Sequence, residues 1–175
     1  ANITHVSGHI DPIDDIETVN LELILADLEV VENRLPKIEK KAQLKTDKDA
    51  IVEYDILMRL KNAFEKEIPA REVPLSDDEK LFIKNYQFLT MKPMLYVCNV
   101  SEDEMVDGND YSKKVMEYAS KHNSKVVIIS AKIEEELSEL DDEEHKMFLE
   151  ELGIKESGLD KLIKEAYALL GLQTF

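Results

Sequence analysis

Lys92-Pro-Met-Leu-Tyr-Val-Cys-Asn-Val-Ser-Glu102 contains the clearest signal of the fold of this chain. Met94–Cys98 is a short apolar run that predicts a buried strand, and the polar residues Asn99 and Glu102 follow it directly. Open α/β sheets bind ligands beyond the carboxyl ends of their strands. An amide donates and accepts hydrogen bonds and a carboxylate accepts them, so both side chains suit the edge of a purine base. A simple turn that caps a helix would use the same residues, so this stretch alone leaves both interpretations open.

A second strand and its loop favour the ligand-binding interpretation. Lys125–Ile129 is another apolar run, and Ser130-Ala131-Lys132 follows its end. Two neighbouring loops at strand ends, the second beginning with small residues, suit a base slot that backbone N–H groups close. A helical segment lies between the strands, and helices are predicted over 132–138, 141–151 and 158–170. This order of elements predicts a parallel sheet with helical crossovers.

The residues before this α/β pattern have a helical period. Apolar positions recur three and four residues apart on both sides of the polar segment Lys45–Asp49, which predicts an antiparallel helical hairpin. Pro36 should bend or locally break the first helix. Ser76 and Glu79 resemble a capping box and predict a helix to about Leu89. The apolar positions are Leu21, Ile24, Leu28, Val31, Leu35, Ile38 and Ala42 in the first helix and Ala50, Tyr54, Leu57, Leu60, Phe64 and Ile68 in the second.

Composition limits the class of protein. The 175 residues are 43% hydrophobic, enough for one ordinary core, and the net charge of −16 argues against a general nucleic-acid coat protein. The single cysteine, Cys98, excludes an intrachain disulfide, fits a reducing compartment and is predicted to be a small buried residue rather than a reactive thiol. No apolar run approaches the roughly 18 residues of a membrane span, and no signal peptide opens the chain. We therefore expect a soluble, cytoplasmic protein without membrane association.

The two loops resemble a known pair of motifs. Asn99-Val-Ser-Glu102, followed one strand later by Ser130-Ala131-Lys132, resembles the fourth and fifth G motifs of a translation-factor-class P-loop GTPase. Three longer segments resemble the YchF family of Obg-related GTPases over essentially the whole chain. They are the opening Ile3-Thr-His-Val-Ser-Gly-His-Ile-Asp-Pro-Ile-Asp-Asp-Ile-Glu17, the segment from Phe88 to Glu102, and the closing segment 158–175.

This resemblance implies the fold class. We expect an α/β protein, namely the C-terminal half of a P-loop NTPase G domain with a parallel sheet and an inserted antiparallel helical coiled-coil hairpin. The G domain would comprise residues 1–17 and 76–175, and the hairpin residues 18–75. No G-x-x-x-x-G-K-[S/T] phosphate loop is present. By the resemblance, the phosphate loop, the Mg²⁺ ligands and a C-terminal TGS domain belong to a longer parent, and this chain alone would hydrolyse nothing.

The resemblance also implies ATP or GTP as the ligand, but the motif departs from the usual Asn-Lys-x-Asp. Val100 replaces the lysine, and Glu102 replaces the aspartate that pairs with guanine. The longer glutamate displaces its carboxylate and should weaken guanine discrimination, because losing a matched hydrogen-bond pair shifts specificity strongly. Our hypothesis is that the parent accepts ATP. Asn99 would bind the adenine edge and Val100 would cover a base face, while Ser130 and Ala131 would supply backbone contacts.

His5 is a candidate catalytic residue. In the resembled family an apolar residue replaces the usual water-orienting glutamine, and a histidine in a His-Val-x-Gly segment is assigned the compensating role. His5-Val-Ser-Gly8 matches that segment. A neutral imidazole could orient the attacking water near the γ-phosphate. A histidine without any role is the alternative.

The tip of the predicted hairpin is basic, unlike the rest of the chain. Its basic residues are Arg34, Lys37, Lys40, Lys41, Lys45 and Lys48, against the acids Glu39 and Asp47. A solvated helix face with i,i+4 pairs is the commoner meaning of such a pattern. Because the resembled family is linked to ribosomes, contact with ribosomal RNA phosphates is the functional hypothesis.

The acidic run Asp141–Glu144 is predicted to open a helix, where acids complement the helix dipole, and no metal site is expected there.

Two rival functions stay open. The hairpin could be a protein- or ribosome-docking module with the α/β part as its scaffold. Alternatively, the chain could be an unrelated α/β binding domain in which Asn-x-x-Glu is a coincidence.

Overall fold

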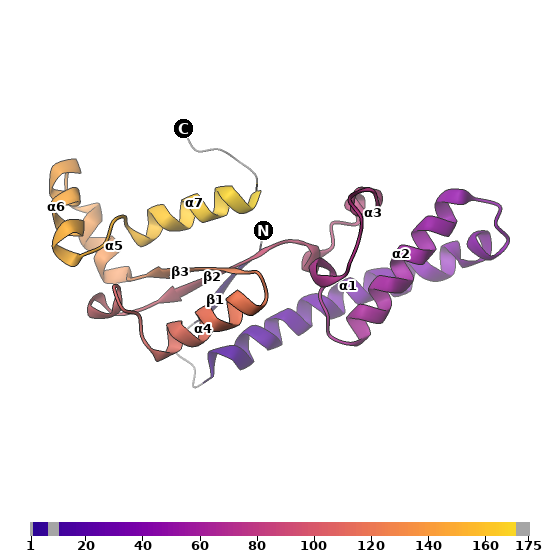
Figure 1. Ribbon diagram of the computed structural model, residues 1–175, viewed down its shortest axis with the longest axis horizontal. Helices are drawn as coiled ribbons and strands as arrows, with labels where there is room; N and C mark the ends of the chain where they lie inside the picture. The colour runs from indigo at the N-terminus through magenta and orange to yellow at the C-terminus, as the bar shows by residue number, and fades with distance from the viewer. Residues whose placement is uncertain (1, 7–10, 171–175) are drawn as a thin grey trace. The chain divides into compact units, whose positions relative to one another are not determined.

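A computed structural model describes residues 2–6 and 11–170 of the chain, with the side chains of residues 11–169 (Figure 1). The chain packs as two compact units. The first, which we call the α/β unit, is Ala1–Ile16 with Pro93–Phe175, and the second, the helical unit, is Glu17–Lys92. An α/β fold with a parallel sheet and a helical hairpin was the expected fold class, and it is confirmed.

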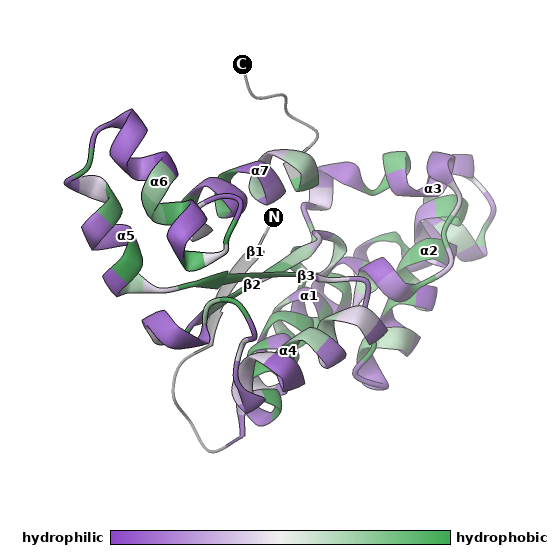
Figure 2. Cartoon of the chain, turned by 60° about the vertical axis from the view of Figure 1, so that its left-hand side comes forward, coloured by the Kyte–Doolittle hydropathy of each residue, from purple (hydrophilic) through white to green (hydrophobic). Residues whose placement is uncertain are grey.

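A three-stranded parallel sheet in the order β1-β2-β3 forms the centre of the α/β unit. β1 (Asn2–Val6), which the sequence patterns did not predict, pairs with β2 (Met94–Asn99), and β2 pairs with β3 (Lys125–Ile129). Figure 1 shows α4 (Asp110–Lys121) and α7 (Gly158–Leu170) on opposite sides of the sheet. Because helices cover both faces, every residue of β2 before Asn99 is buried, and β2 and β3 are largely hydrophobic (Figure 2).

The helices after β3 confirm the predicted order. α5 (Ala131–Ser138) and α6 (Asp142–Leu152) precede α7. Gly153 ends α6 at a φ of 76°, a left-handed conformation that favours glycine. Asp141 caps α6 by accepting the Glu144 N–H at 2.8 Å, as expected for an acidic run that opens a helix. A small separate core packs α5 against α6 through Ile133, Leu137 and Leu149.

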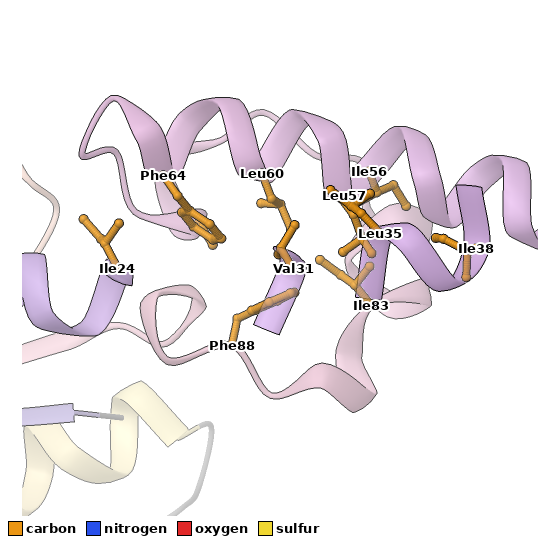
Figure 3. Packing of buried hydrophobic residues seen from close by; sticks show 11 residues of the cluster. Ile24, Val31, Leu35, Ile38, Ile56, Leu57, Leu60, Phe64, Ile83 and Phe88 are labelled. Atoms are coloured by element: carbon orange, nitrogen blue, oxygen red, sulfur yellow. The ribbon is translucent and has the colours of Figure 1, made fainter. Parts of the chain in front are cut away.

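Two helices build the hairpin of the helical unit. α1 (Pro12–Gln43) and α2 (Lys48–Glu65) are joined by a short turn, in which the Asp47 carboxylate caps α2. Pro36 lies inside α1, which continues through this residue to Gln43. The apolar stripe of each helix faces the other, as Figure 3 shows. Its buried members include Ile24, Val31, Leu35, Ile38, Ile56, Leu57, Leu60 and Phe64.

The predicted helix from Ser76 to Leu89 is shorter than expected. The capping box of Ser76 and Glu79 is confirmed, but α3 covers only Asp77–Phe82. Short 3-10 turns follow, η2 (Lys84–Tyr86) and η3 (Leu89–Met91), with Gln87 in a left-handed conformation between them. The helix does not continue beyond Phe82, because these turns bring both Ile83 and Phe88 into the hairpin core.

Residues 76–92 consequently pack with the hairpin, although the sequence assigned them to the G domain. A short 3-10 turn, η1 (Ala70–Glu72), links α2 to this segment. Ile68, predicted as the last apolar position of the second helix, lies beyond the end of α2 and is 38% exposed. The unit is thus a hairpin with a packed return segment rather than two helices alone.

A buried carboxylate fastens the return segment to α1. Asp27 is 2% exposed, and its oxygens accept the N–H groups of Leu89 (2.9 Å) and Thr90 (2.8 Å) and the Thr90 hydroxyl (2.7 Å). The Thr90 hydroxyl oxygen in turn accepts the N–H of Ala70 at 2.9 Å. The Arg71 guanidinium donates to the Thr90 carbonyl at 3.1 Å. This network therefore fixes the chain shortly before it enters β2.

Candidate functional site

The two loops predicted to form a base slot lie next to each other at the carboxyl ends of β2 and β3. Asn99 is the last residue of β2, its side chain is exposed, and its Oδ1 accepts the Ala131 N–H at 3.2 Å. The N–H of Val100 donates to the Ile129 carbonyl at 2.8 Å. Parallel pairing of β2 with β3 brings the loops together, since both strands end at the same edge of the sheet.

An ion pair makes a second link between the loops. Glu102 begins the 3-10 turn η4 (Glu102–Glu104), and its Oε2 lies 3.3 Å from the Lys132 Nζ. The Glu102 carboxylate raises the pKa of Lys132, which keeps the ammonium charged. Each loop thus contributes one residue to a hydrogen bond and one to an ion pair, so the Asn-x-x-Glu and Ser-Ala-Lys segments form one surface.

Two predicted residues serve the fold of the loops. Val100 is only 7% exposed, which weighs against a role in covering a base face. Ser130 is 1% exposed and caps α5, since its hydroxyl oxygen accepts the Ile133 N–H. Ser101 and Glu104 also form a capping box, so the stretch is a capped turn as well as a loop beside Ser130-Ala131-Lys132.

The backbone N–H groups of the second loop are partly used. Ala131 donates to Asn99, and Ile133 donates to the Ser130 cap. The N–H of Lys132 has no hydrogen-bond partner within the described part of the chain. This N–H, in the first turn of α5, is therefore the backbone donor left for a ligand.

Glu134 is a residue of this region that the sequence analysis did not single out. Its Oε1 accepts the N–H groups of Gly158 (2.9 Å) and Leu159 (3.3 Å), which open α7. A Cβ on Gly158 would come within 2.8 Å of Ile129 Cγ1 and 3.0 Å of the Ile128 carbonyl, so α7 starts close against β3. Glu134 thus anchors α7 to the helix that carries Ala131 and Lys132.

Other candidate residues fall outside these loops. His5 belongs to β1 and pairs in register with Val97, and only its backbone is described. Cys98 is buried, and burial raises the pKa of its thiol to about 11, as expected for an unreactive cysteine. Within the described residues, no three His, Cys, Asp or Glu side chains gather in a way that could hold a metal ion.

The hairpin tip keeps most of its predicted basic surface. Arg34 is an exception, because its guanidinium donates to both oxygens of Glu53 at 2.9 and 3.3 Å. The remaining basic residues are exposed and form no ion pair with any described residue. They are Lys37, Lys40, Lys41, Lys45 and Lys48.

Among the described residues, none of the helices combines the length and apolar character that a membrane span needs.

No protein-family model matches the sequence. A Bacillus subtilis protein described as ribosome-binding ATPase YchF is 57% identical, over 99% of this chain and 48% of its own length. Obg-like ATPase 1 of Caenorhabditis elegans is 32% identical, over 99% of this chain and 45% of its own. The solved structure of the Schizosaccharomyces pombe YchF GTPase matches with a TM-score of 0.81 at 28% identity, covering 97% of this chain and 47% of that one.

The fold and its match to a solved YchF structure define the class: part of a P-loop NTPase G domain, carrying an inserted helical hairpin. The chain spans about half the length of the curated relatives it matches. Because the similarity extends along almost its entire length, the chain belongs to the YchF family.

Proposed function

We propose that this chain supplies the base-recognition part of a nucleotide-hydrolysing protein that accepts ATP as well as GTP. The observation that carries the proposal is the double link between the two loops, from Asn99 to Ala131 and from Glu102 to Lys132. It places an amide, a carboxylate and the Lys132 N–H beside one another at the end of a parallel sheet, where such folds bind ligands.

The free hydrogen-bonding groups suit a purine. With Asn99 Oδ1 occupied by Ala131, the amide nitrogen still has donors for the purine N7, an acceptor that adenine and guanine share. Asn99 therefore selects purines, and discrimination between them falls to Glu102. A carboxylate at this place accepts from the adenine amino group or from the two adjacent N–H donors of guanine.

Titration of ATP and GTP into the protein as its gene encodes it tests this proposal. We expect comparable binding of the two nucleotides, a loss of both on Asn99→Ala, and a shift toward guanine on Glu102→Asp. Asp107→Ala is the control, because Asp107 is exposed a few residues further along the chain and has no hydrogen bond or ion pair with Ser130-Ala131-Lys132 among the described residues. Nucleotide affinities that do not change on substitution of Asn99 and Glu102 would refute the assignment.

For hydrolysis, we propose that His5 orients the attacking water and that Mg²⁺ is bound by residues other than those described here. The register of His5 with Val97 puts it on the strand beside β2. His5→Ala should slow turnover and spare nucleotide binding, while His145→Ala, a change in α6, should alter neither. Unchanged turnover in His5→Ala would contradict the assignment.

A second function, contact with ribosomal RNA, is favoured by the unpaired lysines of the hairpin tip and by the description of the Bacillus subtilis relative as ribosome-binding. A cytoplasmic location is part of this proposal, since ribosomes work there. Reversing the charge of Lys40, Lys41 and Lys45 should weaken co-sedimentation with ribosomes and flatten its salt dependence. Reversal of Lys113 and Lys114, exposed on α4, should do neither. Ribosome binding that needs the tip but is indifferent to nucleotide would favour the docking-module alternative.

A further inference from the structure

Lys132 holds one of the two oxygens with which Glu102 would meet a base. Its Nζ lies 3.3 Å from Glu102 Oε2, and no other hydrogen bond to this carboxylate is found among the described residues. The Glu102 side chain is 30% exposed and the Lys132 side chain 69% exposed, so the pair lies at the open end of the loops. One carboxylate oxygen is thus occupied and the other is available.

The number of available oxygens matters because the two purines present different donors. Guanine offers adjacent ring and amino N–H groups, which pair best with both oxygens of one carboxylate at once. Adenine offers a single amino group beside a ring nitrogen that only accepts. A carboxylate with one oxygen engaged by an ammonium can satisfy adenine fully but satisfies guanine only in part.

We propose that Lys132 is a specificity-determining residue, which lowers the preference for guanine by occupying one oxygen of Glu102. The inference rests on the proposed base-binding role of Asn99 and Glu102. The side chain of Lys132 would act on the base indirectly, through the Glu102 carboxylate. The backbone N–H of Lys132 remains a separate hydrogen-bond donor. This role of Lys132 also explains how a carboxylate at the position that binds guanine in related motifs can bind ATP.

The test is the ratio of GTP affinity to ATP affinity, measured on the protein as its gene encodes it. Lys132→Met removes the charge and keeps the apolar stem. We expect it to raise the ratio about two- to fivefold, the range that a partly exposed ion pair supports. Lys132→Arg retains a cation that can hold Glu102, so its ratio should stay near that of the unmodified protein. The ratio cancels contributions from the phosphates, which are the same in both nucleotides.

Lys164→Met is the matched control. Lys164 pairs with Glu156 at 2.6 Å, and the side-chain exposures of 66% and 32% are nearly those of Lys132 and Glu102. Loss of this pair should leave the ratio unchanged. Raising the salt concentration should move the ratio of the unmodified protein toward that of Lys132→Met, because salt screens exposed pairs, and should leave the variant where it is.

The outcomes separate this inference from the function on which it rests. If Asn99→Ala abolishes binding but Lys132→Met leaves the ratio unchanged, the specificity role of Lys132 is wrong and the base slot stands. If neither Asn99→Ala nor Glu102→Asp affects nucleotide binding, both are wrong. A ratio that rises equally in Lys132→Met and Lys132→Arg would also overturn the inference, because the arginine retains the charge.

Discussion

The two units of this chain use carboxylates in opposite ways. In the helical unit, Asp27 is buried and accepts hydrogen bonds from two backbone N–H groups and one hydroxyl. In the α/β unit, Glu102 is partly exposed and has one ion pair, with half of its carboxylate available. A buried, saturated carboxylate fixes a structure, whereas an exposed and half-occupied one keeps one oxygen available for a ligand. The comparison predicts that stability depends on the first kind of residue and specificity on the second.

Removing Asp27 should give the largest loss of stability. Asp27→Ala leaves the buried N–H of Thr90 without its acceptor and frees a hydroxyl, so we expect the free energy of unfolding to fall by about 3 kcal/mol. Asp27→Asn keeps one oxygen acceptor and should cost less. Glu29→Ala, at an exposed position of the same helix, should change stability by less than about 0.5 kcal/mol. Denaturant unfolding measures all three, and equal effects of Asp27→Ala and Glu29→Ala would show that the buried carboxylate does not stabilise the helical unit.

Glu53 is an intermediate case, and its effect should depend on pH. Burial raises the pKa of Glu53, but hydrogen bonds from the Arg34 guanidinium and the Tyr86 hydroxyl outweigh burial and lower it below the ordinary 4.5. A lowered folded-state pKa stabilises above the unfolded value, and that stabilisation is lost as the pH falls through the folded value.

We therefore expect Glu53→Gln to cost about 1–2 kcal/mol at pH 7 and progressively less below pH 4.5. Unfolding of both proteins between pH 7 and 3 provides the measurement. Glu39→Gln, an exposed change on α1, supplies the control. A loss that is the same at pH 7 and pH 3 would show that packing, and not the charge, is responsible.

Glu134 should have a smaller effect on the α/β unit. Glu134→Ala removes the acceptor for two N–H groups at the start of α7, and loss of a helix cap costs about 1 kcal/mol. Glu135→Ala, the exposed neighbour, is the matched change without a cap. Hydrogen exchange of the Leu159 amide gives a local readout, and it should quicken only in Glu134→Ala.

Local patterns predicted much of this structure. The alternation of strand and loop at Met94–Glu102 and Lys125–Lys132 located both halves of the candidate site, because hydrophobic runs and motif residues lie close together in the chain. The seam of the hairpin followed equally from its period. The short turns after Phe82 were not predictable in this way. The capping box indicates a longer helix, but burial of Ile83 and Phe88 favours the turns instead.

The polar links escaped the sequence analysis for a different reason. Asp27 resembles any acid on a helix, and its partners Leu89 and Thr90 are 62 and 63 residues away in the chain. Glu134 likewise meets Gly158 24 residues further on. The sequence motifs predicted that Glu102 and Lys132 lie in neighbouring loops, but only the structure shows that their side chains form an ion pair. Distances between segments, and not residue types, determine such contacts.

The smallest effect on stability should come from Lys132→Met. Its side chain is 69% exposed, and ion pairs of this kind contribute little to folding because water solvates both partners well. We expect the midpoint of denaturant unfolding to stay unchanged in the same protein whose GTP-to-ATP affinity ratio rises. Asp27→Ala should show the reverse pattern: a lower midpoint and, in the fraction that remains folded, an unchanged ratio. If Lys132→Met instead lowered the midpoint as much as Asp27→Ala, the ion pair between the loops would serve mainly to stabilise the fold, and the division between saturated and half-occupied carboxylates would fail.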